Sequence, residues 1–218
     1  MTQTRDVGYD HCMTTEPVTL DELQPFVDPS VDHIIAYGMM GSIIYGLDSD
    51  TSDRDIVAVV EGTHRMDRQV IQGDLDCRVM SMESLGERLT KSIPNEVDMV
   101  RSDLFKVVYP EYRPYLNAIR FNVYEYIKRN QSQIRSTQIK KDLPETAKQR
   151  RRETKSIKAG VRAAMMNRRV AADMSRNFRV RFNDAERAEY FENVLNVVTA
   201  RADGATKQDV VDMILQLQ

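Results

Sequence analysis

The chain has 218 residues, of which 41% are hydrophobic and 29% are charged. This length allows one large domain or two small ones, and the balance is that of an ordinary globular protein, not of a disordered or fibrous chain. The longest apolar runs are too short to cross a bilayer, and the first residues lack the apolar stretch of a signal peptide. We therefore expect a cytoplasmic protein that does not enter a membrane.

Cysteine and histidine usage argues against a zinc site. The two cysteines, Cys12 and Cys77, have neither metal-finger spacing nor the number that a disulfide scaffold requires. The three histidines are scattered and place no two imidazoles on one helical face. We expect both cysteines to be reduced.

The net charge of −2 hides a separation of charge along the chain. Residues 120–182 hold 18 Lys and Arg against 5 Asp and Glu, a net charge of +13, whereas the remainder holds 13 bases and 28 acids, a net charge of −15. Basic helices often serve only as solvated faces or dock against an acidic part of the same protein. A surplus this large also fits a polyanionic partner such as RNA or another nucleic acid.

The first half of the chain alternates predicted helices and strands. Thr19, with Glu22 three residues later, forms a capping-box pattern that predicts a helix over residues 19–27. A β-branched, apolar run then predicts a buried strand that stops at Gly38. Further strands and helices are predicted at residues 53–60, 69–80 (a hairpin turning at Gly73 and Asp74), 81–91 and 95–101.

The second half of the chain is predicted to be helical. One long amphipathic helix is expected over residues 112–134, and a basic helix follows Pro144 and reaches residue 172. Two further helices are expected at residues 184–200 and 207–217. This order favours an α+β fold, in which a small mixed sheet flanked by helices precedes a C-terminal helical bundle.

Two carboxylates stand at the start of the strand predicted for residues 53–60. Asp53 and Asp55 are two residues apart, and because strand side chains alternate between faces, both project to the same side. Two like charges this close favour a bound divalent cation, and oxygen ligands favour Mg²⁺ or Mn²⁺. Asp76 can complete a three-carboxylate cluster if its strand lies beside the first, with Asp74 as the alternative third ligand in the hairpin turn.

Gly41 and Ser42 supply the complementary part of this pattern. A glycine in a turn after a strand lets backbone N–H groups approach phosphate oxygens, and Ser42 adds a hydroxyl donor. No Walker loop and no dinucleotide fingerprint is present. Tyr45 either packs beneath this turn or touches the substrate.

The run from Gly41-Ser42 to Ser52-Asp53-Arg54-Asp55-Ile56 resembles the G-S-x(n)-S-D-x-D-h signature of the DNA polymerase β-like nucleotidyltransferase superfamily. It is most similar to the predicted nucleotidyltransferases found in many bacteria and phages. The strand around Asp76, the turn at Pro94-Asn95-Glu96 and the helix from Lys155 to Arg162 resemble further motifs of that branch, so the likeness covers residues 34–190. Two departures are Ile43, where many relatives place an arginine, and Arg54, where an apolar or aromatic residue is usual.

The resemblance implies a metal-dependent transfer of a nucleoside monophosphate (NMP) from a nucleoside triphosphate (NTP) to an acceptor hydroxyl, with release of pyrophosphate. It implies a catalytic domain at residues 1–110 and a basic helical domain at 111–218. The implied metal ligands and catalytic residues are Asp53, Asp55 and Asp76, and the implied nucleotide contacts are Gly41, Ser42, Lys155 and Arg162.

Two alternatives to a nucleic-acid acceptor stay open from the sequence. The acceptor could instead be a small molecule or a protein side chain, in which case nucleic-acid binding that falls steeply with salt would be absent. A chain of this kind that has lost turnover would act as a nucleotide or RNA sensor, which Ile43 favours. Mg²⁺-dependent NTP binding without pyrophosphate release would identify such a sensor.

Overall fold

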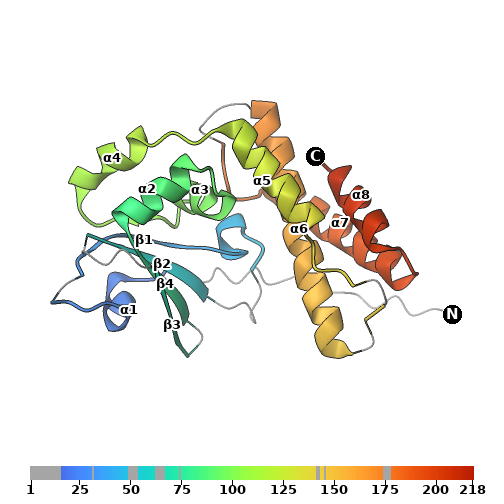
Figure 1. The fold of residues 1–218 in the computed structure, drawn as a ribbon, viewed down its shortest axis with the longest axis horizontal. Coiled ribbons are helices and arrows are strands. Elements are labelled where there is room, and N and C mark those ends of the chain that lie inside the picture. Colours follow the sequence, from blue (N-terminus) through green and yellow to red (C-terminus); the bar gives the residue numbers. More distant parts are fainter. Residues whose placement is uncertain are drawn as a thin grey trace.

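The structure is a computed structural model of the chain, and it describes residues 16–30, 32–48, 54–61, 67–73, 75–140, 143–144, 146–173 and 178–218. These residues form a mixed sheet with helices on both faces and a C-terminal helical region at one end of the strands (Figure 1). The predicted α+β class is confirmed. Among the described residues, no helix combines the length and the hydrophobicity that crossing a bilayer requires.

The sheet has five strands in the order β3-β4-β2-β1-β5. Their bounds are β1 Ile34–Met39, β2 Arg54–Val60, β3 Arg68–Gln72, β4 Leu75–Ser81 and β5 Lys106–Val107. β2 and β4 are parallel, whereas β1–β2, β3–β4 and β1–β5 are antiparallel. The carboxyl end of β1 and the amino ends of β2 and β4 therefore lie together at the same end of the sheet. The two-residue strand β5 has no counterpart among the predicted elements.

Short helices cover both faces of the sheet. α1 (Leu20–Leu23) and the 3₁₀ turn η1 (Gln24–Phe26) lie on one face, and α2 (Met82–Thr90) and α3 (Pro94–Arg101) lie on the other (Figure 1). α1 begins with the predicted capping box, in which the Thr19 hydroxyl accepts from the Glu22 N–H and the Glu22 carboxylate accepts from the Thr19 N–H.

The predicted long helix over residues 112–134 is wrong. The chain instead forms a 3₁₀ turn η3 (Pro110–Tyr112), a short helix α4 (Arg113–Ala118) and a separate helix α5 (Val123–Arg135). The break places Phe121 in the core, where its ring lies 6.0 Å from Tyr126 and 5.8 Å from Phe178. Asn122 then caps α5 with its side chain, and its own N–H donates to the Ser92 hydroxyl at 2.7 Å. Burial of one aromatic ring outweighs the continuous amphipathic pattern.

The C-terminal region is built on the long helix α6 (Ala147–Asp173), against which α5, α7 (Asp184–Ala202) and α8 (Lys207–Leu215) all pack. A buried ion pair fixes the first half of α6, because Arg201 of α7 reaches Glu153 of α6 at 3.3 Å. The same guanidinium donates to the carbonyl oxygens of Lys140 and Ala205 at 2.9 and 2.8 Å. Each buried charge is therefore both paired and hydrogen-bonded, as burial demands.

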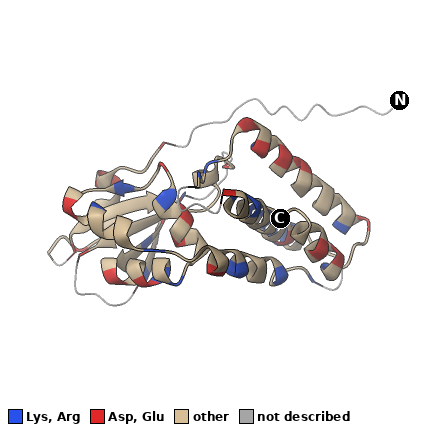
Figure 2. Cartoon of the chain, turned by 90° about the horizontal axis from the view of Figure 1, so that it is seen from above, with Lys and Arg blue, Asp and Glu red and all other residues tan. Residues whose placement is uncertain are grey.

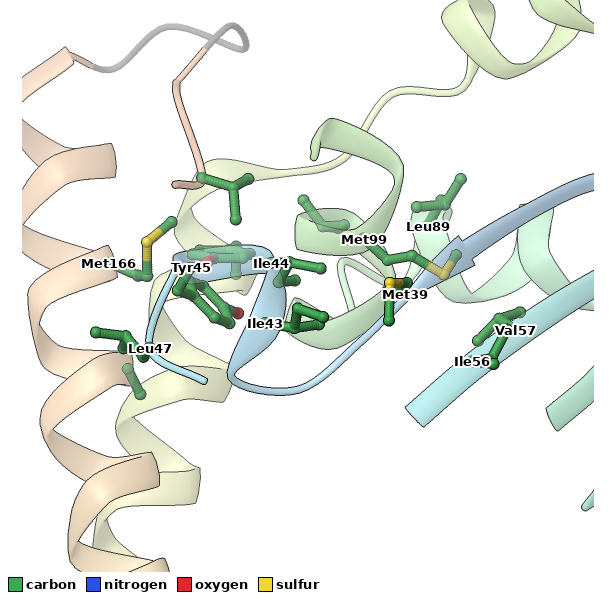
Figure 3. Close-up of a cluster of buried hydrophobic side chains, with 14 of the residues drawn as sticks. Met39, Ile43, Ile44, Tyr45, Leu47, Ile56, Val57, Leu89, Met99 and Met166 are labelled. Atoms are coloured by element: carbon green, nitrogen blue, oxygen red, sulfur yellow. The ribbon is translucent and has the colours of Figure 1, made fainter. Parts of the chain in front are cut away.

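The turn that follows β1 joins the sheet to the helical region. Its 3₁₀ segment η2 (Ile43–Tyr45) is buried, with apolar side chains of the sheet and α3 on one side and Met166 of α6 on the other (Figure 3). The carbonyl of Tyr45 accepts a hydrogen bond from the Phe182 N–H at 3.0 Å, and the two rings lie 5.9 Å apart. The turn is thus held from both sides of the molecule.

Candidate active site

A cavity of about 640 Å³ lies between the sheet and the helices α6 and α7, where the carboxyl end of β1 meets the amino ends of β2 and β4. Its volume is typical of a site for a small organic ligand. Six of the residues assigned to the site from the sequence line this cavity: Gly41, Ser42, Asp55, Asp76, Lys155 and Arg162. Asp53 and Asp74 lie outside the described residues.

Two carboxylates form the acidic side of the cavity. Asp55 of β2 and Asp76 of β4 are direct partners in the parallel register, so their side chains project from the same face of the sheet. Both are half-buried. The side-chain amide of Gln69 on β3 donates to both carboxylate oxygens of Asp76, at 2.8 and 2.7 Å, and so orients that carboxylate.

The glycine of the turn is required at its position for two reasons. Gly41 has a φ of +77°, in the left-handed region that side chains disfavour. A Cβ at this residue would lie 2.8 Å from Oδ2 of Asp55, which is closer than real Cβ atoms approach. The neighbouring Met40 N–H donates to the Asp55 carbonyl at 2.8 Å, which fixes the turn to β2. Gly41 therefore keeps the space beside the Asp55 carboxylate open.

The donor set at this end of the sheet fits a magnesium-type ion. Asp55 and Asp76 supply carboxylate oxygens from neighbouring strands, and hard divalent cations prefer oxygen ligands. Within the described residues, no three His, Cys, Asp or Glu side chains are grouped closely enough to hold a metal on their own. Two protein carboxylates together with phosphate oxygens and water are a sufficient set for Mg²⁺, which usually keeps several such ligands.

Cations of α6 form the wall opposite the carboxylates. Arg151, Lys155, Lys158 and Arg162 all line the cavity, at spacings of four, three and four residues that place them on one helical face. In Figure 2, α6 is seen nearly end-on between the sheet and α7, with its basic residues in blue. The cavity thus has an acidic side on the sheet and a basic side on the helix.

A buried tyrosine supports the innermost of these cations. The guanidinium carbon of Arg162 lies 4.7 Å from the centre of the Tyr45 ring. Tyr45 is buried, and its hydroxyl donates to Asp98 at 2.5 Å. Tyr126 donates to the same carboxylate at 2.8 and 3.0 Å. Tyr45 therefore packs beneath the turn, which is the first of the two roles left open by the sequence.

Burial raises the pKa of Asp98 to about 6, although the two tyrosine hydroxyls and the nearby charges of Arg162 and Arg101 act in the opposite direction. The same burial, with the Asp98 charge, raises the pKa of Tyr45 well above its ordinary value. The hydroxyl of Tyr45 therefore stays protonated and remains a hydrogen-bond donor to Asp98.

Several residues that line the cavity were not found by sequence reasoning. Arg78 lies two residues after Asp76 on β4, so it shares the face of the carboxylates, and the buried Glu96 of α3 holds it at 3.4 Å. The period-two alternation of a strand was the signal that could have found Arg78. Asn95 belongs to the turn that resembles a motif of the nucleotidyltransferase branch, although it was not assigned to the site. No local pattern points to Gln69, Tyr190 or Phe191, which also line the cavity.

No protein-family model matches this chain. A search of curated proteins likewise finds no relative.

Proposed function

We propose that this chain is a metal-dependent nucleotidyltransferase, which moves an NMP from an NTP to an acceptor hydroxyl and releases pyrophosphate. The observation that carries the proposal is the composition of a single cavity, in which strand carboxylates, a glycine-serine turn and a row of helix cations face one another. These parts come from regions of the chain more than 100 residues apart, Gly41 at one end and Lys155 at the other. Each part meets one demand of the reaction.

The carboxylates of the cavity would act at the α-phosphorus, where the transfer takes place. Asp55 and Asp76 would hold Mg²⁺ or Mn²⁺, which supplies charge neutralisation for the departing pyrophosphate and lowers the pKa of the attacking hydroxyl. The oxygen of the acceptor hydroxyl forms a bond to the α-phosphorus, and the bond from that phosphorus to the oxygen bridging to the β-phosphate breaks. The hydroxyl proton passes to a carboxylate or to water, and pyrophosphate carries away the bonding electron pair.

The turn and the helix serve the triphosphate. The Ser42 hydroxyl does not cap the 3₁₀ segment that follows it, so it is available to the cavity, and Gly41 presents backbone without a side chain. Lys155 and Arg162, two turns apart on one face of α6, supply positive charge to the β- and γ-phosphates. Arg162 is held by the Tyr45 ring beneath it, so less ordering is needed when a nucleotide binds.

The decisive experiment incubates the purified chain with each α-³²P-labelled NTP, Mg²⁺ and total cellular RNA, and follows both label transfer and pyrophosphate release. The wild type should release pyrophosphate and label an acceptor. Asp55→Asn and Asp76→Asn, made separately, should each lower turnover by more than about 100-fold, beyond the effect typical of groups outside the metal's own ligands. The double variant Asp53→Ala with Asp55→Ala should abolish transfer without unfolding the chain.

A matched control separates catalysis from loss of charge. Asp103 is an exposed carboxylate that does not line the cavity, so Asp103→Asn should leave turnover unchanged. Equal activity of Asp55→Asn and wild type, with both folded by circular dichroism, would reject the proposal. Mg²⁺-dependent NTP binding with no pyrophosphate release would select the nucleotide-sensor alternative instead.

A further inference from the structure

Seven of the nine cations of α6 fall into two groups with different surroundings. At the end of the helix, Arg168 forms two hydrogen bonds of 2.7 Å with Glu189 of α7, and Arg169 pairs with Glu186. A second group runs along the helix from its first turn to Arg162, and all of its members except Arg162 are exposed. Its members are Lys148, Arg151, Lys155, Lys158 and Arg162, which we call the basic stripe.

Docking against acidic residues of the same chain explains only the first group. Among the described residues, the four exposed members of the basic stripe form no ion pair with a carboxylate. Such a row of like charges repels itself and therefore costs stability when nothing offsets it. Five of the 18 bases of residues 120–182 thus lie in the basic stripe, and four of these five line the cavity.

The stripe is straight and longer than a nucleotide requires. Its members follow one another at intervals of three, four, three and four residues, which keeps them on one face of the helix. From Lys148 to Arg162 the helix rises by about 21 Å, at about 1.5 Å per residue. The three phosphates of an NTP are joined through single oxygen atoms and can contact only neighbouring turns of such a row. Lys158 and Arg162, the last two members of the stripe, line the cavity, whereas Lys148, the first member, lies outside it.

A nucleic-acid strand matches the length of the stripe. One strand carries a phosphate for about every 3.4 Å of helical rise, so about 21 Å corresponds to roughly six stacked nucleotides. This length falls within the usual range of about 4–16 nucleotides for a single-strand binding site.

The cavity restricts how such a strand can approach. A volume of about 640 Å³ is the size of a site for one small ligand, so the cavity can hold a nucleotide unit but not a helical segment of a duplex. The wall contributed by α7 also presents the half-buried Phe191, whose ring lies 5.2 Å from that of the buried Tyr190. Aromatic rings next to a basic groove are the usual means of binding unpaired bases.

We infer that the basic stripe of α6 binds a single-stranded nucleic acid and guides its end into the cavity, where its terminal hydroxyl is the acceptor. The acceptor role rests on the proposed transferase function, whereas the binding of the strand does not.

The test measures binding without any NTP. A fluorescein-labelled, unstructured RNA of 12 nucleotides is titrated with the full chain, and anisotropy gives the Kd at 50 and 200 mM salt. With about four phosphate contacts and a single-strand slope of about −0.7 per contact, the wild-type Kd should rise roughly 50-fold between these two salts. The double variant Lys148→Glu with Arg151→Glu should bind at least about 10-fold more weakly at 50 mM salt and show a shallower salt dependence.

The single variant Lys148→Glu is compared with a matched control, Lys128→Glu, which is an equal charge reversal in the same basic segment at an exposed lysine of α5 that lies outside the cavity. The control should bind RNA as the wild type does, and a duplex of the same sequence should bind more weakly than the single strand. Equal weakening by Lys128→Glu, equal duplex binding or no RNA binding would each overturn the inference. Label transfer without RNA binding would overturn the inference and leave the transferase proposal intact with another acceptor. RNA binding without label transfer would support binding by the stripe and reject the transferase proposal.

Discussion

The hydroxyl of Tyr45 donates a 2.5 Å hydrogen bond to the carboxylate of Asp98, a residue 53 positions later in the chain. This bond joins the turn after β1 to α3, and the Tyr45 ring carries the Arg162 guanidinium of α6 on its face. One buried carboxylate therefore holds together three elements that border the cavity. The arrangement leads to predictions for stability and for nucleotide binding.

Replacing Asp98 by asparagine should change how stability depends on pH. Burial raises the pKa of Asp98 from 3.8 to about 6, so its neutral form is favoured in the folded state. The stability that the neutral Asp98 carboxyl gives the folded state is fully present below about pH 4 and is lost as the pH rises through 6. The loss is about 3 kcal/mol, since each pKa unit corresponds to about 1.36 kcal/mol. The stability of Asp98→Asn minus that of the wild type should thus grow by up to this amount between pH 4 and pH 7.

Urea denaturation of both proteins at several pH values measures this difference, and the contributions of all other titrating groups cancel in it. The charged and titratable groups that face Asp98 are Tyr45, Tyr126, Arg162 and Arg101. Burial raises the pKa of Tyr45 and of Tyr126 well above the ordinary value, so both hydroxyls stay protonated over this range. A difference that stays constant across this range would show that Asp98 does not change its protonation there.

Arg162→Lys should weaken nucleotide binding more than it slows turnover. Lysine keeps the positive charge but loses the planar group that stacks on Tyr45, so the charge is no longer held towards the triphosphate. Loss of an interaction of about 1 kcal/mol should raise KM for the NTP by several-fold to about tenfold, with a smaller change in kcat. Arg152→Lys is the control, since Arg152 is exposed on the same helix and does not line the cavity. Equal KM values for the two variants would contradict the role of the stack.

Gly41→Ala should abolish most activity at a small cost in stability, and the chain offers a matched control in Gly73→Ala. Both glycines have positive φ, +77° and +64°, so alanine strains either backbone by about 1–2 kcal/mol. Only at Gly41 does the new Cβ meet Asp55, at 2.8 Å, whereas at Gly73 nothing lies within 4 Å. Steady-state turnover and thermal unfolding of both variants test this, and equal activities would show that the space beside Asp55 is not needed.

Local patterns in the sequence predicted much of the fold. The capping box at Thr19, the strand around Asp55 and the basic helix all depend on residues that are neighbours in the chain, and each forms close to its predicted bounds. The helix predicted over residues 112–134 failed because the burial of Phe121 depends on Phe178, which is 57 positions away. No local period carries that information.

The same distinction holds for the site. The alternation of a strand was enough to place Asp55 on a face, but the pairing with Asp76 depends on the register of two strands that are not consecutive. The expectation that Lys155 and Arg162 face those carboxylates came from the resemblance, and spacing alone could not supply it. The hydrogen bond from Tyr45 to Asp98 could not be predicted from the sequence. The sequence left two roles open for Tyr45, and Asp98 belongs to no motif.

Mg²⁺ should stabilise the folded chain, and the effect should require the strand carboxylates. Asp55 and Asp76 lie side by side in the register of β2 and β4, so their charges repel until a cation binds between them. At 100 times its Kd, a ligand that binds only the folded state adds about 2.7 kcal/mol, and for a chain of this size each kcal/mol raises Tm by about 2–4 °C. The wild type should therefore melt several degrees higher in saturating Mg²⁺ than in EDTA, whereas Asp76→Asn should shift by about 1 °C or less. Scanning calorimetry of both proteins, with Asp103→Asn as the charge-matched control, measures the shift. If Asp76→Asn gained as much as Asp103→Asn, Mg²⁺ would be acting elsewhere on the chain, and the assignment of Asp76 as a ligand would have to be withdrawn.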